Sequence, residues 1–203
     1  MASDAKLARR GSLDAFADEL QNASSDAIRI EPLPFRSVVN LRGRVTEEFS
    51  AAIEAATGVA LPLEPNRWLG DGHHAAIWLG PDEWLLVAPD GEADMIERSI
   101  RAARPNGRWL SLVDVSHNYT SMLLSGPCVR DLLAKGCALD LHPRVFVSGD
   151  CAQTLLAKTR VFLCALDDAT VIEVFIGNSF SPYTVQWLLD ASAEFQAAEA
   201  AKR

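Results

Sequence analysis

The hydrophobic and polar positions of the chain predict the same order of elements twice. In the first half, the alternating run SVVNLRG precedes a helix over residues 45–57, which Thr46 begins and Gly58 stops. In the second half, SMLLSG precedes a helix that Pro127 opens and Gly136 stops. The inward positions of the two helices are Phe49, Ala52, Ile53 and Ala56 in the first, and Val129, Leu132 and Leu133 in the second.

Each half then continues with a β-hairpin and a second helix. AAIWLG and EWLLVA flank Pro81-Asp82, while RVFLCAL and TVIEVFI flank Asp167-Asp168, whose side chains suit a turn. Ser181 caps the last helix. The inward positions of these helices are Met95, Ile96, Ser99, Ile100 and Ala103, and Val185, Leu188, Leu189 and Phe195. The pattern predicts an α+β fold of two pseudo-repeated β-α-β-β-α units, with antiparallel-rich sheets packed with helices.

The expected domain organisation follows from these repeats. It comprises a polar and amphipathic N-terminal tail (1–26), a first α+β repeat (27–104), a second α+β repeat (108–195) and a C-terminal tail (196–203). The turn-forming residues Pro105-Asn106-Gly107 mark the boundary between the repeats. Since each repeat has one apolar sheet face and two helices, the two units are expected to pack as one α+β body.

The N-terminal tail carries a short amphipathic segment. Ser12 is a cap for a helix with Leu13, Phe16, Ala17 and Leu20 on one face. A helix this short is marginal in water, so its apolar stripe must pack on this protein or on a partner, unless the segment is disordered. We expect it to take part in an assembly, with Leu13, Phe16 and Leu20 as partner contacts.

Composition narrows the classes of partner. The chain has 203 residues, is 49% hydrophobic and carries a formal net charge of -8, which argues against nucleic acid or an anionic membrane surface. No apolar run reaches the roughly 18 residues of a membrane span. The four cysteines form no C-x-x-C pair, and the N-terminus lacks an apolar signal core. These features predict free thiols and a cytoplasmic location.

One stretch, LVDVSHNYTSMLLSG, places Asp114, Ser116 and His117 within four positions. Strand alternation sends Asp114 to one face, while Ser116 and His117 leave the strand in a turn, so the three side chains do not line up as a catalytic relay. We interpret Asp114 and Ser116 as acceptors for local backbone amides, with an exposed recognition corner as the alternative.

Other candidate sites are weaker. His73-His74 lies in a glycine-rich turn without further ligands at metal-site spacing. The chain contains neither G-x-G-x-x-G nor G-x-x-x-x-G-K-[ST], so no dinucleotide or phosphate loop is expected. The sequence therefore predicts no catalytic, cofactor-binding or metal-binding residue in this chain.

Three motifs in order carry a resemblance to a known family. They are LGPDEWLLVAP, the long run from DVSHNYTSMLLSGP to TRVFL, and FIGNSFSPYTVQWLLDA. Over residues 77–191, with a weaker likeness upstream to Arg36, the chain resembles the gamma subunit of heterotetrameric sarcosine oxidase. DVSH followed by SGP is shared with the wider aminomethyltransferase-like superfamily of folate-binding proteins.

The resemblance implies a non-catalytic subunit of an enzyme complex. Such an enzyme oxidises sarcosine to glycine with release of hydrogen peroxide, and the methyl carbon leaves as formaldehyde or methylenetetrahydrofolate. FAD, FMN, NAD and tetrahydrofolate are then expected in the complex, none of them in this chain, with the alpha, beta and delta subunits as partners. The corner residues Asp114, Ser116, His117 and Tyr119 become expected contacts with a neighbouring subunit.

Two other functions are compatible with the same superfamily. One is a free-standing folate-binding or folate-dependent one-carbon transfer protein, whose glycine-rich strand and acid are replaced here by Lys158-Thr159-Arg160-Val161. The other is an iron–sulfur assembly protein, whose KGCY-x-GQE stretch matches only Lys135-Gly136-Cys137 here. Both departures favour the subunit interpretation.

Overall fold

Two five-stranded antiparallel sheets with helices on their outer faces form the molecule. The computed structural model describes residues 9–103 and 109–200, and the backbone alone for 198–200. The first sheet contains, in spatial order, β3 (Trp68–Gly70), β4 (Ala75–Gly80), β5 (Glu83–Pro89), β2 (Arg36–Gly43) and β6 (Leu110–Asp114). The second contains β8 (Cys151–Leu156), β9 (Thr159–Ala165), β10 (Val171–Gly177), β7 (Tyr119–Ser125) and β1 (Arg29–Pro32).

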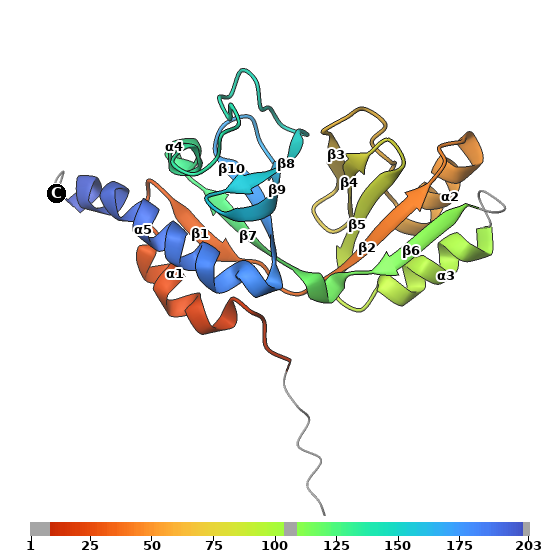
Figure 1. Ribbon diagram of the computed structural model, residues 1–203, viewed down its shortest axis with the longest axis horizontal. Coiled ribbons are helices and arrows are strands. Elements are labelled where there is room, and N and C mark those ends of the chain that lie inside the picture. The colour runs from red at the N-terminus through yellow and green to blue at the C-terminus, as the bar shows by residue number, and fades with distance from the viewer. Residues whose placement is uncertain (1–8, 104–108, 201–203) are drawn as a thin grey trace, which may run out of the picture.

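The two sheets repeat one another strand by strand. In each, a strand–helix unit is followed by three more strands and a second helix, and the spatial orders β3-β4-β5-β2-β6 and β8-β9-β10-β7-β1 correspond. Figure 1 shows the two halves side by side, with their helices turned outward and β3–β5 facing β8–β10. The predicted α+β fold of two pseudo-repeated units is confirmed.

The edge strands correct the expected domain boundaries. β6, which was expected in the second repeat, pairs with β2 of the first sheet, with Leu41 opposite Leu112. β1, expected in the first repeat, pairs with β7 of the second sheet, with Ile30 opposite Leu124. The edge strand of each sheet therefore comes from the other side of the expected boundary. The sequence did not indicate this exchange, because alternation predicts a strand but not the strand with which it pairs. Pro105-Asn106-Gly107 lies outside the described residues.

The capping signals of the first predicted helix are confirmed, whereas Ser181 does not cap the last helix, because it is itself helical and its hydroxyl donates to the Asn178 carbonyl. In α2 (Glu47–Thr57), the Thr46 hydroxyl accepts a hydrogen bond from the Phe49 N–H at 3.1 Å. Gly58 ends the helix with φ at 73°, a conformation that glycine adopts without steric cost. The hairpin turns after β4 and β9 also lie where predicted.

The later helices differ in detail from the expected pattern. In α3 (Ala93–Ala103), Met95, Ser99 and Ala103 are exposed, and Ile96 and Ile100 carry the buried stripe with Ala93. Those three positions lie beside the buried stripe, and the sheet covers only a narrow face of α3. α5 spans Ser181–Ala200, so the expected C-terminal tail is helical as far as residue 200.

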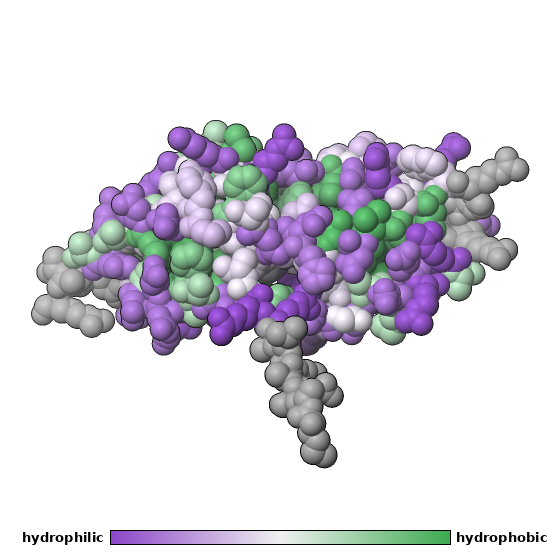
Figure 2. Space-filling view, turned by 60° about the horizontal axis from the view of Figure 1, so that its bottom comes forward, coloured by the Kyte–Doolittle hydropathy of each residue, from purple (hydrophilic) through white to green (hydrophobic). Residues whose placement is uncertain are grey.

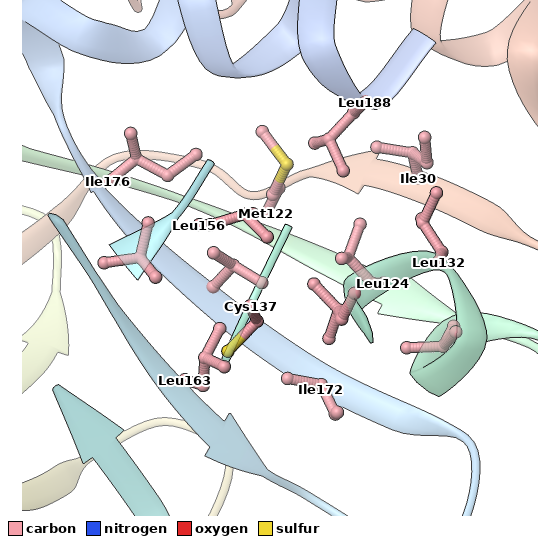
Figure 3. Packing of buried hydrophobic residues seen from close by; sticks show 14 of the residues in the cluster. Ile30, Met122, Leu124, Leu132, Cys137, Leu156, Leu163, Ile172, Ile176 and Leu188 are labelled. Atoms are coloured by element: carbon pink, nitrogen blue, oxygen red, sulfur yellow. The ribbon is translucent and has the colours of Figure 1, made fainter. Parts of the chain in front are cut away.

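Three hydrophobic clusters hold the elements together. One joins the first sheet to α2 and α3, and another joins the second sheet to α1 (Ala17–Ala23), α4 (Val129–Ala134) and α5. In the second cluster, Figure 3 shows Leu132 of α4 and Leu188 of α5 pointing toward side chains of the sheet such as Leu124. The third lies between the helix-free faces of the two sheets and includes Val38, Leu85 and Phe175. This inter-sheet cluster makes the two halves one body.

Candidate functional site

The crossover corner, residues 114–119, connects β6 of the first sheet to β7 of the second. The Asp114 Oδ1 accepts hydrogen bonds from the Ser116 N–H at 2.9 Å and from the Ser116 hydroxyl at 2.5 Å. The same hydroxyl accepts from the N–H of buried Val38 at 2.9 Å, which ties the corner to β2. The interpretation of Asp114 as an acceptor for a local backbone amide is confirmed, whereas the Ser116 hydroxyl accepts from an amide 78 positions away rather than from a local one.

The corner does not form a catalytic relay. The Ser116 hydroxyl is hydrogen-bonded to Asp114 and to the N–H of Val38. His117 takes part through its backbone carbonyl, which accepts from the Asn178 side-chain amide at 2.5 Å. Leu112 lies in the first-sheet core and Val115 packs against the inter-sheet cluster, as alternation along the strand requires. Asp114 and His117 are exposed, whereas Ser116 is half-buried.

Tyr119 is more enclosed than a docking residue was expected to be. Its ring contacts that of Phe162 in an edge-on arrangement with 5.5 Å between centroids, beside the inter-sheet cluster. Burial, with a smaller effect from Glu83, raises the pKa of its hydroxyl. Tyr119 therefore contributes to the contact between the sheets, and only part of its ring is open to solvent.

The N-terminal segment packs on the chain's own second sheet. Leu13 is 2% exposed and Leu20 is fully buried, both in the cluster that Ile30 and Leu188 share. Phe16 packs against the same cluster and is partly buried. The expectation that Leu13 and Leu20 contact a partner protein is corrected, because both side chains are buried against the second sheet of their own chain. The predicted helix is also later and shorter, with a 3-10 turn at Asp14–Phe16 before α1.

A cavity of about 600 Å³ lies between the helix-free faces of the two sheets. Trp68, Ile77, Leu123, Leu166 and Phe175 contribute apolar side chains to its wall. Its rim includes the exposed residues Pro34, Gly72, His73 and Asp90, so the cavity communicates with the surface. A concave space of this kind, mainly apolar with a few polar groups and open to solvent on one side, is the usual form of a small-molecule site.

The buried charged groups of this cavity are Arg36 of β2 and Glu173 of β10, which pair across the two sheets, while His73 and Asp90 lie on its exposed rim. The Arg36 Nη1 donates to the Glu173 Oε1 at 3.0 Å, and the two side chains are only 16% and 10% exposed. The Ser121 hydroxyl also hydrogen-bonds to the Glu173 carboxyl. Burial raises the pKa of Glu173, although Arg36 and Ser121 oppose that shift.

The sequence analysis did not identify this pair. The signal was present, since Glu173 is the single charge in the apolar run VIEVFI, and a lone charge in a buried strand requires a partner. The partner lies 137 positions away along the chain, which is why no local pattern indicates it.

The cysteines do not form a nucleophilic site. Cys137, Cys151 and Cys164 are buried free thiols and Cys128 is half-buried. Cys151 faces Cys164 across β8 and β9. Burial raises the pKa of Cys151 to about 12 and that of Cys164 well above its usual value, so both are poor nucleophiles at neutral pH.

The histidine loop is fixed by carboxylates. Asp71 accepts from the N–H groups of His73 and His74, and these bonds lower its pKa. The His74 Nε2 lies 2.9 Å from the Glu92 Oε2. Within residues 9–103 and 109–200, no cluster of three or more His, Cys, Asp or Glu side chains could hold a metal ion.

The hairpin between β9 and β10 also agrees with its predicted role. The Asp167 carboxylate accepts from the Thr170 hydroxyl and from the N–H groups of Ala169, Thr170 and Val171. Burial alone would raise its pKa, but these hydrogen bonds outweigh it and lower the pKa. The Lys158-Thr159-Arg160-Val161 stretch forms the turn and first residues of the neighbouring β8–β9 hairpin, without an acidic side chain.

Exposed hydrophobic side chains mark one further surface. Trp109 and Val113 are 52% and 49% exposed and share the face of the edge strand β6 that is opposite Leu112. Figure 2 shows hydrophobic residues on both halves of this face, including a group on its right over the half with the first sheet, with hydrophilic residues between and below them. Among the described residues, no helix has both the length and the apolar character needed to cross a membrane.

Comparison with known proteins gives a consistent result. Residues 42–194 match the sarcosine oxidase, gamma subunit family. The chain is 34% identical over 190 residues to the sarcosine oxidase subunit gamma of Corynebacterium sp. (strain U-96), covering 93% of this chain and 91% of the relative. It is 32% identical over 192 residues to the corresponding subunit of Arthrobacter sp., covering 92% and 91%.

Solved structures extend the comparison to the fold. The chain superposes with a TM-score of 0.83 and 31% identity on a chain of the heterotetrameric sarcosine oxidase from Corynebacterium sp. U-96, covering 92% of this chain and 96% of that one. It also resembles the glycine cleavage system aminomethyltransferase T from Bartonella henselae, with a TM-score of 0.57, 11% identity and coverage of 84% and 48%. The second likeness shows the aminomethyltransferase-like fold alone.

Proposed function

Since the chain belongs to the sarcosine oxidase gamma subunit family, we propose that it is the gamma subunit of a heterotetrameric sarcosine oxidase, with a structural role and no active site of its own. The observation that carries the proposal is the superposition over 92% of this chain and 96% of a chain from such a heterotetramer. Coverage of 96% of that chain matters because it leaves no separate domain of the relative unmatched.

In this proposal the redox chemistry belongs to the partner subunits. FAD, FMN, NAD and tetrahydrofolate are held by the alpha and beta chains, and the delta chain completes the complex, in which sarcosine is oxidised to glycine. The chemistry of this chain supports that division. Its buried thiols are disfavoured as thiolates, and the Asp114, Ser116 and His117 side chains are not arranged as a relay.

The surface that contacts the partners is proposed to comprise the crossover corner and the adjoining face of β6. Asp114 and His117 supply exposed polar groups, and Val113 and Trp109 supply exposed apolar ones. A mixture of an apolar anchor and a polar rim is typical of protein interfaces. β6 is also the edge of its sheet, so part of its outer backbone is available for pairing, although the Leu112 carbonyl accepts from the Arg101 side chain at 3.4 Å.

The proposal is tested by purifying the chain alone and together with co-expressed alpha, beta and delta subunits. We expect the lone chain to be colourless and to release no hydrogen peroxide from sarcosine. The tagged chain should co-purify with a flavin-containing complex. Flavin absorbance in the extensively washed lone chain, or peroxide release by it, would contradict the proposal.

The docking surface is tested in the same co-purification. Val113→Asp places a charge on an exposed apolar position and should reduce recovery of the partner subunits by about tenfold. The matched control is Leu155→Asp on β8, a residue of similar exposure (53%) on an edge strand of the other sheet. Equal recovery with both variants would show that the partners bind elsewhere.

A further inference from the structure

The cavity between the two sheets is a feature that a purely structural role does not explain. Its volume of about 600 Å³ falls within the range of roughly 300 to 1,000 Å³ typical of ligand sites. The exposed rim residues leave a route by which a small molecule could enter.

The buried part of the cavity wall is apolar apart from one charged pair and the Cys164 thiol, and His73 and Asp90 lie at the exposed rim. Trp68, Leu123 and Phe175 provide broad apolar surface, while Arg36 and Glu173 place charged groups at the same wall. Taking two charges out of water is expensive, and apolar residues of similar volume often stabilise a protein as well or better. The pair is therefore an unexpected choice if the wall served only for packing.

Hydrogen-bond capacity at the pair is unbalanced toward donors. A guanidinium has five N–H donors, and among the described residues Arg36 uses one of them, from Nη1 to Glu173. The Glu173 carboxyl already accepts from both Arg36 and Ser121. The unused capacity at this wall thus lies mainly on Arg36, and it requires acceptor atoms.

From this geometry we propose that the inter-sheet cavity binds a small organic carboxylate, with its apolar body against Trp68 and Phe175 and its carboxylate on the Arg36 guanidinium. A planar carboxylate matches the fork of a guanidinium and can accept two parallel hydrogen bonds. An amine would have to displace Arg36 from Glu173, which makes it the poorer ligand. This inference does not depend on the proposed role as a subunit.

The protonation of Glu173 can change when a ligand carboxylate binds to Arg36. The groups that face it are Arg36 on β2, Ser121 on β7 and Cys164 on β9. Burial favours the neutral form of Glu173, so the carboxyl can take up a proton when a ligand carboxylate engages Arg36. Glu173 is then a positioning residue that keeps the guanidinium at the cavity wall.

The test uses two probes of the same shape, 2-naphthylacetate and 2-(2-naphthyl)ethanol, titrated into the purified full-length chain by calorimetry. The wild-type chain should bind the acid at least about tenfold more tightly than the alcohol, as expected for a charge-assisted hydrogen bond in a partly dry site. Arg36→Met should remove this preference. Glu173→Gln should keep it, because the glutamine retains the shape and removes the competing charge.

Two further variants separate binding from folding. Arg98→Met, on the outer helix α3, is the matched control and should leave both affinities unchanged. Leu123→Trp, which fills the cavity beside Glu173 without altering the charges, should weaken both probes about tenfold or more. If Arg36→Met does not fold, the test rests on Leu123→Trp and on Arg36→Lys. Arg36→Lys keeps the positive charge but loses the paired N–H donors of the guanidinium, so it should reduce the preference for the acid over the alcohol.

Three results would overturn the inference. The first is no binding heat from either probe with the folded wild-type chain. The second is equal affinity for acid and alcohol, and the third is a preference for the acid that survives in folded Arg36→Met or is unaffected by filling the cavity.

Discussion

At the residue scale, Ser116 joins the corner to the first sheet. Its hydroxyl donates to Asp114 and accepts from the N–H of Val38, so one side chain satisfies two groups from different strands. Val38 is buried, and water cannot readily replace a lost partner there. Asp114 is exposed, and solvent can take over part of its role.

We therefore predict that Ser116→Ala lowers the free energy of unfolding by about 1 to 3 kcal/mol, because it leaves a buried N–H without an acceptor. Asp114→Ala should cost less, about 1 kcal/mol. Urea denaturation monitored by circular dichroism measures both. Ser111→Ala, an exposed position on β6, is the control and should stay within about 0.5 kcal/mol of wild type. A larger loss for Asp114→Ala than for Ser116→Ala would show that the aspartate holds the corner.

At the scale of elements, the N-terminal segment acts as a cover for the second sheet. α1 lies against β1 and α5, and its apolar stripe enters the same cluster as Ile30 and Leu188. Gln196 of α5 donates to the Ala23 carbonyl at 2.6 Å and so holds the two helices together. The segment is too short to be a stable helix in isolation, and packing supplies what local propensity lacks.

This placement predicts that Leu20→Ala lowers the free energy of unfolding by about 2 to 5 kcal/mol, the usual cost of truncating a fully buried leucine. Phe16→Asp should also lower the melting temperature of the isolated chain, since it puts a charge beside the core. Thermal unfolding is the measurement, with Asp18→Ala on the exposed side of α1 as control. Unchanged melting for Leu20→Ala would mean that the segment leaves the sheet in solution.

At the scale of the whole molecule, the two halves are held together at their helix-free faces. The inter-sheet cluster and the pair of Arg36 with Glu173 lie at this contact, and the crossover corner connects the halves covalently. Burial raises the pKa of Glu173 above its ordinary value of 4.5 in the folded state. The folded chain thus holds this proton more tightly than the unfolded chain does, which links stability to pH.

The sign of the effect follows from that shift. The contribution of Glu173 to stability is fully present below its unfolded pKa, near 4.5, and is lost as pH rises through the higher folded value. Relative to Glu173→Gln, the wild-type free energy of unfolding should therefore fall as pH increases above about 4.5. Denaturation of the wild-type chain and of Glu173→Gln across this pH range measures the difference between their free energies of unfolding. The contributions of the other carboxylates are the same in both proteins and cancel in this difference. A difference that grows with pH would instead indicate that attraction to Arg36 outweighs burial.

The sequence by itself determined the local elements and the family of this protein. Thr46 and Gly58 bound their helix, Asp167 forms its turn, and Asp114 with Ser116 forms the corner, because each feature depends on residues a few positions apart. The repeated pattern likewise predicted the α+β fold. The motifs between residues 77 and 191 indicated a resemblance to the gamma subunit of sarcosine oxidase, and the comparisons support it.

Only the tertiary structure decided which distant segments meet. β1 and β6 each complete the sheet of the other half, and Leu13 and Leu20 pack inside their own chain. Arg36 and Glu173 lie 137 positions apart in the sequence and form the buried charged pair in the wall of the inter-sheet cavity. Alternation and helical periodicity show that a face will be buried, but not which surface buries it, because that choice depends on the packing of the whole chain.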